Sequence, residues 1–275
     1  MLRSSNEYKD VSKRAHHPEL DMPTLSEMDG VRYLHFGSPW IQGAMQISHP
    51  SRLVFLYTRQ MMAWLLFLSS KSVNKIGVLG LGAGSLARYC MKYTKAEVEV
   101  LEWNPSVTAF CQQYFRLPKQ ERFTITHEDA QLWVKAPEQK NSCEVLLVDL
   151  YDYTAQGPVA SSLEFYKNCY KTLKDNGILV VNLFGHHPSF TKNIQNINKA
   201  FAERTLLFDE TEDGNRIVLA FKGAPLIVSE ADYYARARVL ERFAEIEALL
   251  MAKELESQLR HKANTHGLAD HEFSV

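Results

Sequence analysis

The sequence has only four cysteines, and Cys90, Cys111, Cys143 and Cys169 are too widely spaced to form a C-x-x-C motif. It also lacks a recognisable signal peptide, so we expect reduced thiols and a cytoplasmic protein. Basic and acidic residues nearly cancel, 31 against 32, which gives no basic field favouring nucleic acid. The most hydrophobic run, Met61–Leu68, is far too short to span a membrane, and a buried helix is expected there.

Metal ligands are also scarce. The adjacent His16 and His17 are expected to be solvated rather than metal-binding, and no metal site is predicted. With 275 residues, of which 45% are hydrophobic, the chain can nevertheless bury a large core.

Four segments flank or precede the main domain. Residues 1–27 mix charges and prolines without periodicity and are expected to form a flexible lead-in. Residues 28–70 predict a small β unit, with strand-like runs VRYLHFG and IQGAMQI, followed by a helix over 58–69. Residues 226–262 contain one long predicted helix, 231–260, that packs on the domain or on a second subunit, and 263–275 are expected to be a frayed tail.

Residues 71–225 alternate strand and helix patterns, which predicts a parallel sheet with crossover helices. The predicted strands are 76–81, 98–102, 123–127, 145–149 and 177–184, and the predicted helices are 85–93, 105–115, 130–136, 162–173 and 190–202. The last two strands, 204–208 and 216–221, are joined by a connection too short for a crossover helix, so they form an antiparallel hairpin. We therefore predict an α/β, Rossmann-like sheet of the methyltransferase type, preceded by the small N-terminal β unit.

The stretch KIGVLGLGAGSLAR organises this domain. An apolar strand runs into Gly80, Gly82 and Gly84, and a helix follows at once. Glycine lets the backbone approach a ligand closely and adopt positive φ, and a helix N-terminus suits the polar end of a nucleoside. The spacing G-x-G-x-G fits a sulfonium nucleoside better than the dinucleotide fingerprint, whose third position falls on Ser85.

Four acidic residues follow the carboxyl ends of predicted strands, the edge at which open α/β sheets bind ligands. Glu102 can accept two hydrogen bonds from a ribose diol. Asp129 can accept from an adenine amino group or cap the helix that begins at Ala130. Asp149 is the last residue of the apolar run VLLVD, and Asp152 follows three residues later. Such a pair of carboxylates suits binding and deprotonating an amine.

In this order, these motifs resemble the polyamine aminopropyltransferases, or spermidine synthases, from about Val31 to Phe221. The resemblance implies a sulfonium nucleoside held by the glycine loop, by Glu102 on the ribose, and by Asp129 and Ala130 near the adenine. It also implies that Asp149 is the base for the incoming amine. The implied substrate-binding residues are Asp152, Gln42 and Tyr57.

The chain departs from this family at several positions. The family's glycine loop carries an aspartate that holds the aminopropyl ammonium, and here that position is Ala83. The two positions between the paired aspartates are usually small, and here they are Leu150 and Tyr151. Tyr153 stands in place of the usual proline.

The resulting hypothesis is a spermidine synthase-like enzyme that moves an aminopropyl group from decarboxylated S-adenosylmethionine to a diamine such as putrescine, without a prosthetic group. The alternatives are a methyltransferase that uses S-adenosylmethionine itself and a non-catalytic relative. The expected partners are the polyamine and the nucleoside, with no nucleic acid or membrane, and the expected assembly is a homodimer.

Overall fold

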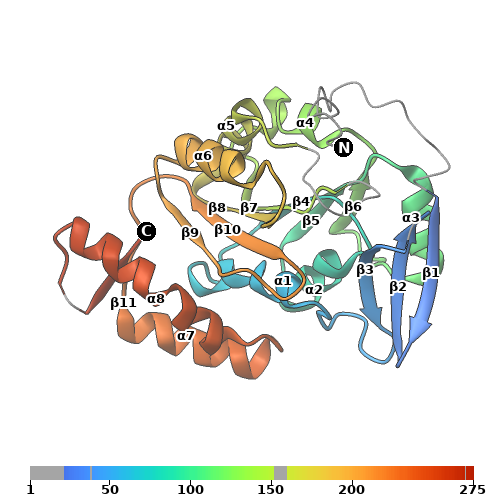
Figure 1. Cartoon of the computed structure of the whole chain (residues 1–275), viewed down its shortest axis with the longest axis horizontal. Coiled ribbons are helices and arrows are strands. Elements are labelled where there is room, and N and C mark those ends of the chain that lie inside the picture. The colour runs from blue at the N-terminus through green and yellow to red at the C-terminus, as the bar shows by residue number, and fades with distance from the viewer. Residues whose placement is uncertain (1–21, 38, 152–159, 270) are drawn as a thin grey trace, which may run out of the picture.

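A computed structural model of the chain describes residues 22–37, 39–151, 160–269 and 271–275. It begins with a three-stranded antiparallel sheet, which stands at one side of the molecule (Figure 1). Its strands, in spatial order, are β1 (Pro23–Met28), β2 (Val31–Phe36) and β3 (Ile41–Gln46). The end of the predicted lead-in is therefore a strand, which pairs with β2 across the two-residue turn Asp29–Gly30 and packs Leu25 against the core.

The seven-stranded central sheet confirms the predicted architecture. Its strands are β4 (Lys75–Leu79), β5 (Glu97–Leu101), β6 (Phe123–Thr126), β7 (Cys143–Val148), β8 (Leu173–Phe184), β9 (Thr205–Leu207) and β10 (Asn215–Phe221), in the spatial order β6-β5-β4-β7-β8-β10-β9. The pairs from β6 to β8 are parallel, whereas β10 is antiparallel to both β8 and β9. β8 begins earlier than the strand predicted over 177–184 and contains an irregularity at 174–177, since Cys143 pairs with Leu173 and Val145 already pairs with Ile178.

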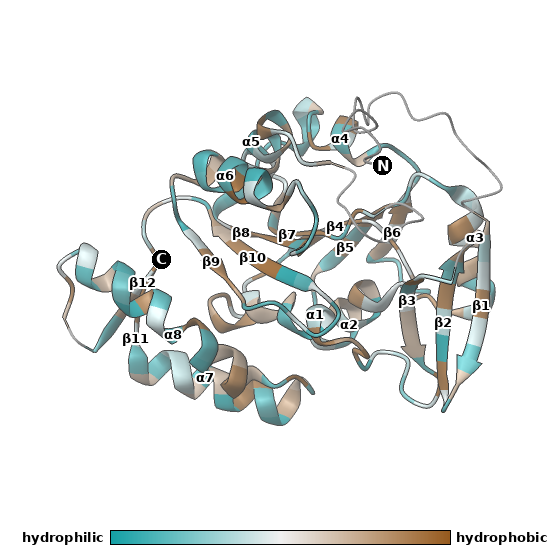
Figure 2. Cartoon of the chain, viewed as in Figure 1, coloured by the Kyte–Doolittle hydropathy of each residue, from teal (hydrophilic) through white to brown (hydrophobic). Residues whose placement is uncertain are grey.

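Helices cover both faces of this sheet (Figure 1). They are α1 (Leu56–Gln60), α2 (Ser85–Tyr93), α3 (Pro105–Tyr114), α4 (Ala130–Trp133), α5 (Leu163–Thr172) and α6 (Phe190–Phe201), with short 3₁₀ helices at Ala63–Leu66 and Pro137–Gln139. Successive residues of β7 alternate between two cores, Val145 and Leu147 on one face, Leu146 and Val148 on the other. This two-sided burial explains the continuous apolar strands, of which β7 and β8 are brown along most of their length in Figure 2.

The helix predicted over 58–69 is two shorter pieces, α1 and the 3₁₀ helix. Met61, Met62 and Trp64 are each fully buried, so this segment has no polar face that would require one regular amphipathic helix. Within the described residues, no helix combines the length and the apolar character needed to cross a membrane.

The C-terminal region also differs from its prediction. The single helix expected over 231–260 is α7 (Glu230–Phe243) followed by α8 (Ala248–Thr265), and Ile246 is buried in the turn between them. The expected frayed tail contains β12 (Glu272–Ser274), which pairs with β11 (Ile227–Ser229). Phe273 and Val275 are buried, and burial of these two apolar side chains fixes the end of the chain.

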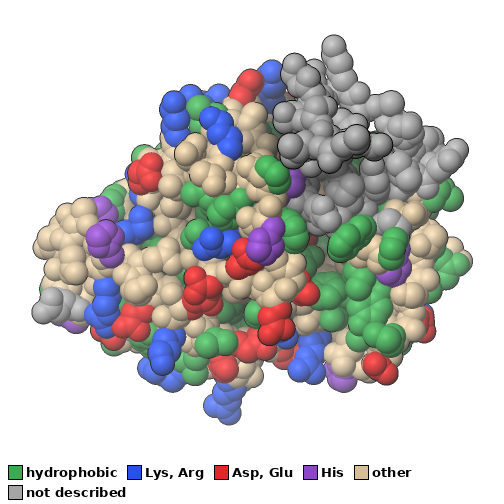
Figure 3. Space-filling model, viewed as in Figure 1, with side chains coloured by type: hydrophobic (Ala, Val, Ile, Leu, Met, Phe, Trp, Pro, Cys, Tyr) green, Lys and Arg blue, Asp and Glu red, His purple; other side chains and the backbone are tan. Residues whose placement is uncertain are grey.

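Several large apolar side chains remain exposed. Met28 and Ile41 lie on the small sheet and Trp40 just before β3, on the side where Figure 3 shows a concentration of hydrophobic atoms. Val239 and Phe243 are exposed one turn apart on α7.

Candidate active site

The glycine loop connects β4 to α2, and its backbone needs glycine. Gly80 has a φ of +99° and Gly82 one of +48°, so the predicted positive φ is present. A Cβ on Gly80 would lie 2.2 Å from the main-chain oxygen of Asp149. The loop is therefore in direct contact with the end of β7, and any side chain at Gly80 would push the two apart.

The small N-terminal sheet lies directly on this loop. A Cβ on Gly82 would lie 3.0 Å from the main-chain oxygen of Gln42, and one on Gly43 would lie 2.7 Å from Cβ of Ala83. Ala83 is 2% exposed. The position at which the family carries an aspartate is thus a buried alanine packed against Gly43 of β3.

Arg88 fastens this arrangement. Its buried guanidinium donates to the main-chain oxygens of Pro50, Ala83 and Phe115, which tie together the N-terminal unit, the glycine loop and the end of α3. Burial lowers the pKa of Arg88 to about 10, so the side chain remains charged at neutral pH. A buried cation held by carbonyl oxygens makes the loop rigid.

Glu102 follows β5 and is 7% exposed. Its Oε2 accepts a hydrogen bond from the Leu81 N–H of the glycine loop at 3.3 Å, and its Oε1 accepts from the Asn104 N–H at 2.9 Å. These bonds hold the carboxylate beside the loop. Ribose binding by Glu102 stays a prediction, which the position of its carboxylate beside the loop supports.

Asp129 follows β6 and caps α4, as one of its two predicted roles requires. Its Oδ1 accepts from the Gln131 N–H at 2.7 Å. Asp129 is exposed, whereas Ala130 is buried in the core beneath it. The cap is established, and a contact between Asp129 and adenine stays a prediction.

Asp149 follows β7 and is hydrogen-bonded to Asn182, which is in turn held by Asn215. Asn182 Nδ2 on β8 donates to Asp149 Oδ1 at 2.9 Å, and Asn215 Nδ2 on β10 donates to Asn182 Oδ1 at 3.0 Å. Burial raises the pKa of Asp149 to about 6, an effect that the Asn182 hydrogen bond opposes. The residue still keeps partial access to solvent, so it can take up and release a proton near neutral pH.

Tyr57, from α1, lies close enough to Asp149 to interact with it electrostatically, while its contact with the amine stays a prediction. Burial, and then the carboxylates of Asp149 and Asp213, raise the pKa of Tyr57 well above its usual value. The phenol therefore stays protonated and faces negative charge. Asp152, the other predicted amine ligand, lies outside the described residues.

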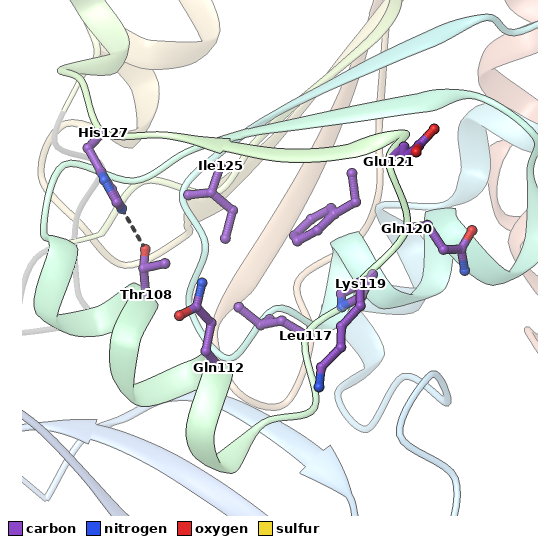
Figure 4. Close-up of a pocket in the computed structure, with 10 residues that line it drawn as sticks. Thr108, Gln112, Leu117, Lys119, Gln120, Glu121, Ile125 and His127 are labelled. Atoms are coloured by element: carbon purple, nitrogen blue, oxygen red, sulfur yellow. Dashed lines mark hydrogen bonds between the residues drawn. The ribbon is translucent and has the colours of Figure 1, made fainter.

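A pocket of about 650 Å³ lies elsewhere, between α3 and the edge strand β6 (Figure 4). Thr108 and Gln112 from α3 face Ile125 and His127 across it, and Thr108 is hydrogen-bonded to His127 at 3.0 Å. None of the predicted site residues lines this pocket, and its shape carries no chemistry of its own. Among the described residues, no group of three or more His, Cys, Asp or Glu side chains is placed to hold a metal ion.

The structure thus gathers Gly80, Gly82, Ala83, Glu102 and Asp149 at one edge of the sheet. Gln42 and Tyr57 approach from the N-terminal unit, and Asp129 follows the neighbouring strand β6. The sequence did not predict the roles of Asn182, which hydrogen-bonds Asp149, and of Asn215, which hydrogen-bonds Asn182. Asn182 had a signal, since it is the only polar residue within the apolar run ILVVNLF. Asn215 had none, because it begins a strand next to a turn.

A mainly parallel sheet that ends in an antiparallel hairpin, with a glycine loop over its carboxyl edge, defines the methyltransferase-type class of α/β folds. A probable spermidine synthase of Corynebacterium glutamicum shares this fold, with a TM-score of 0.66 at 20% identity over 79% of this chain and 83% of that one.

Sequence similarity narrows the class to a family. The spermine/spermidine synthase domain model matches residues 54–208. The polyamine aminopropyltransferase of Neisseria meningitidis is 32% identical over 203 residues, which cover 73% of this chain and 76% of the relative. The polyamine aminopropyltransferase of Chromobacterium violaceum is 30% identical over 226 residues, which cover 82% of this chain and 84% of the relative. The chain belongs to the spermine/spermidine synthase family and is a transferase.

Proposed function

We propose that the protein transfers an aminopropyl group from decarboxylated S-adenosylmethionine to a diamine such as putrescine. The observation that carries this proposal is Asp149, a carboxylate with its pKa raised to about 6, which adjoins the glycine loop at the carboxyl edge of the sheet. The names of the similar polyamine aminopropyltransferases support the same reaction.

The nucleoside end of the site consists of the glycine loop (Gly80, Gly82, Gly84) and Glu102, with Asp129 and Ala130 further along. The Glu102 carboxylate accepts hydrogen bonds from the ribose hydroxyls, and Asp129 Oδ2 accepts one from the adenine amino group. This set needs no prosthetic group, because the sulfonium of the co-substrate is itself the activated leaving group.

The amine end of the site carries the chemistry. Asp149 removes a proton from the protonated amine, and the freed nitrogen lone pair attacks the carbon beside the sulfonium. The new C–N bond forms as the C–S bond breaks, and sulfur keeps that electron pair in neutral 5′-methylthioadenosine. Asn182 occupies Oδ1 of Asp149 and leaves the second oxygen for the proton. Asp152 holds the distal ammonium, and Gln42 and Tyr57 close the site from the N-terminal unit.

Ala83 sets the limit of this proposal. Without the family's aspartate, the donor loses a charge-assisted hydrogen bond to its ammonium, worth about 1.5–3 kcal/mol, which weakens binding roughly ten- to a hundredfold. We therefore expect weak donor affinity with an intact amine site. S-adenosylmethionine gains no compensation from Ala83, since its methionine ammonium and carboxylate also need partners.

Titration with two nucleoside products tests the proposal. We expect 5′-methylthioadenosine to bind more tightly than S-adenosylhomocysteine in calorimetry. The reverse order would favour methyl transfer, and binding of neither would favour a non-catalytic relative. A cytoplasmic location and a homodimer complete the proposal.

A further inference from the structure

Tyr151 lies two residues beyond Asp149, where the chain leaves β7 and still forms an isolated β-bridge. In extended chain, side chains two residues apart lie on the same side. Tyr151 interacts electrostatically with Asp149, with Tyr57 from α1 and with Tyr166 from α5. Its phenol thus belongs to the amine end of the site.

The Tyr151 hydroxyl is buried and has no hydrogen-bond partner within the described residues. Asn215 opposes the rise in the Tyr151 pKa through a weak side-chain hydrogen-bonding interaction, but this contact does not reach the geometry of a full hydrogen bond. Two other buried tyrosine hydroxyls are satisfied, since Tyr89 donates to the Ala244 main-chain oxygen at 2.7 Å and Tyr166 to Asn193 Oδ1 at 2.8 Å. The Tyr93 hydroxyl also has no hydrogen-bond partner among the described residues, but Tyr93 ends α2 and is not among the groups that interact with Tyr151. A buried hydroxyl without a partner is costly and uncommon in native proteins.

The chemistry that would satisfy this hydroxyl is that of an alkyl amine. Burial, and then the charge of Asp149, raise the pKa of Tyr151 well above its usual value, so the phenol stays neutral. A neutral phenol oxygen accepts a hydrogen bond from an amine or ammonium N–H, and its own O–H can donate to a carboxylate. A primary amine that approaches Asp149 supplies such an N–H.

We propose that Tyr151 is a binding residue for the acceptor amine, whose N–H donates to the Tyr151 hydroxyl oxygen while Asp149 takes the proton. This inference rests on the proposed function in its choice of ligand. It adds to that function a residue outside the acidic pair, one that orients the nitrogen rather than accepting its proton.

The test compares Tyr151→Phe with the control Tyr89→Phe. The control also removes one hydroxyl from a buried tyrosine, but that hydroxyl is bonded to the main-chain oxygen of Ala244, outside the candidate site. Putrescine binding is measured by calorimetry on the full chain saturated with 5′-methylthioadenosine, and the Tm is measured for each variant. We expect Tyr151→Phe to weaken putrescine about tenfold or more, with an unchanged or higher Tm. Tyr89→Phe is expected to lower the Tm and leave putrescine affinity unchanged.

Equal putrescine affinity in Tyr151→Phe and the parent, or no measurable affinity in the parent, would overturn the inference. Aminopropyl transfer by the parent is assayed separately. If the parent transfers the aminopropyl group and Tyr151→Phe has the same amine KM, only the role of Tyr151 is refuted, and the proposed reaction stands. Tyr151-dependent diamine binding without transfer would refute the proposed reaction while supporting this binding residue.

Discussion

Asp149→Asn separates stability from catalysis in one substitution. Asn keeps the shape of Asp149 and can still accept the Asn182 hydrogen bond, but it carries no charge. The folded pKa of Asp149 is about 6 against an ordinary value of 3.8, so the folded state binds this proton more tightly than the unfolded state. Ionised Asp149 therefore costs up to about 3 kcal/mol of stability above pH 6.

The raised pKa of Asp149 determines how the stability of Asp149→Asn should depend on pH. Urea unfolding should show Asp149→Asn to be more stable than the parent by up to about 3 kcal/mol at pH 8, with the difference vanishing as the pH falls towards 3.8. Turnover should fall by about 10²–10⁴-fold, and the parent's kcat/KM should rise as the pH passes about 6.

Glu144→Gln is the matched control on the same strand. Its carboxylate bonds Lys174 and the Lys75 N–H, and these contacts outweigh burial and lower the pKa of Glu144. Loss of the Glu144 carboxylate charge should therefore destabilise the protein at pH 8 and leave turnover unchanged. A pH-independent loss of stability in Asp149→Asn would refute the buried-charge argument, and near-native turnover would refute its role as the base.

Two further substitutions and one measurement of the oligomeric state have defined outcomes. Glu102→Gln should weaken 5′-methylthioadenosine at least about tenfold in a folded protein, and unchanged affinity in calorimetry would contradict the ribose role. Gly43→Ala should lower the Tm, because the new methyl group would lie 2.7 Å from both Cβ and N of Ala83. Adding Ala83→Gly should restore only part of this loss, and an unchanged Tm in Gly43→Ala would show that β3 does not pack tightly on the loop. Sedimentation at micromolar concentration should give a homodimer, because Val239 and Phe243 leave apolar surface exposed, and only a 31.5 kDa species would refute it.

The central sheet could be predicted because its signals are local. Continuous apolar strands, the glycine loop and the short connection before β10 each determine one structural choice. The N- and C-terminal parts were harder to predict. β12 pairs with β11, which lies more than forty residues earlier in the sequence, and such a long-range pairing leaves no local pattern. β1 instead pairs with β2 across the two-residue turn Asp29–Gly30, a local hairpin signal that the prediction did not use.

The candidate site divides in the same way. Gly80, Glu102 and Asp149 follow strands that meet at one edge, so parallel topology alone predicts their proximity. The packing of Ala83 against Gly43 could not be foreseen, because it depends on how the small sheet docks on the loop. Asn215 was also missed, since it acts on Asp149 only through Asn182 across an antiparallel strand pair.

The most direct test of the account is product analysis with the purified full chain, decarboxylated S-adenosylmethionine and putrescine. The account predicts equal amounts of 5′-methylthioadenosine and spermidine, at a rate that Asp149→Asn reduces by about 10²–10⁴-fold. The account would be contradicted if this mixture gave no 5′-methylthioadenosine while a second mixture, S-adenosylmethionine with an acceptor, gave S-adenosylhomocysteine.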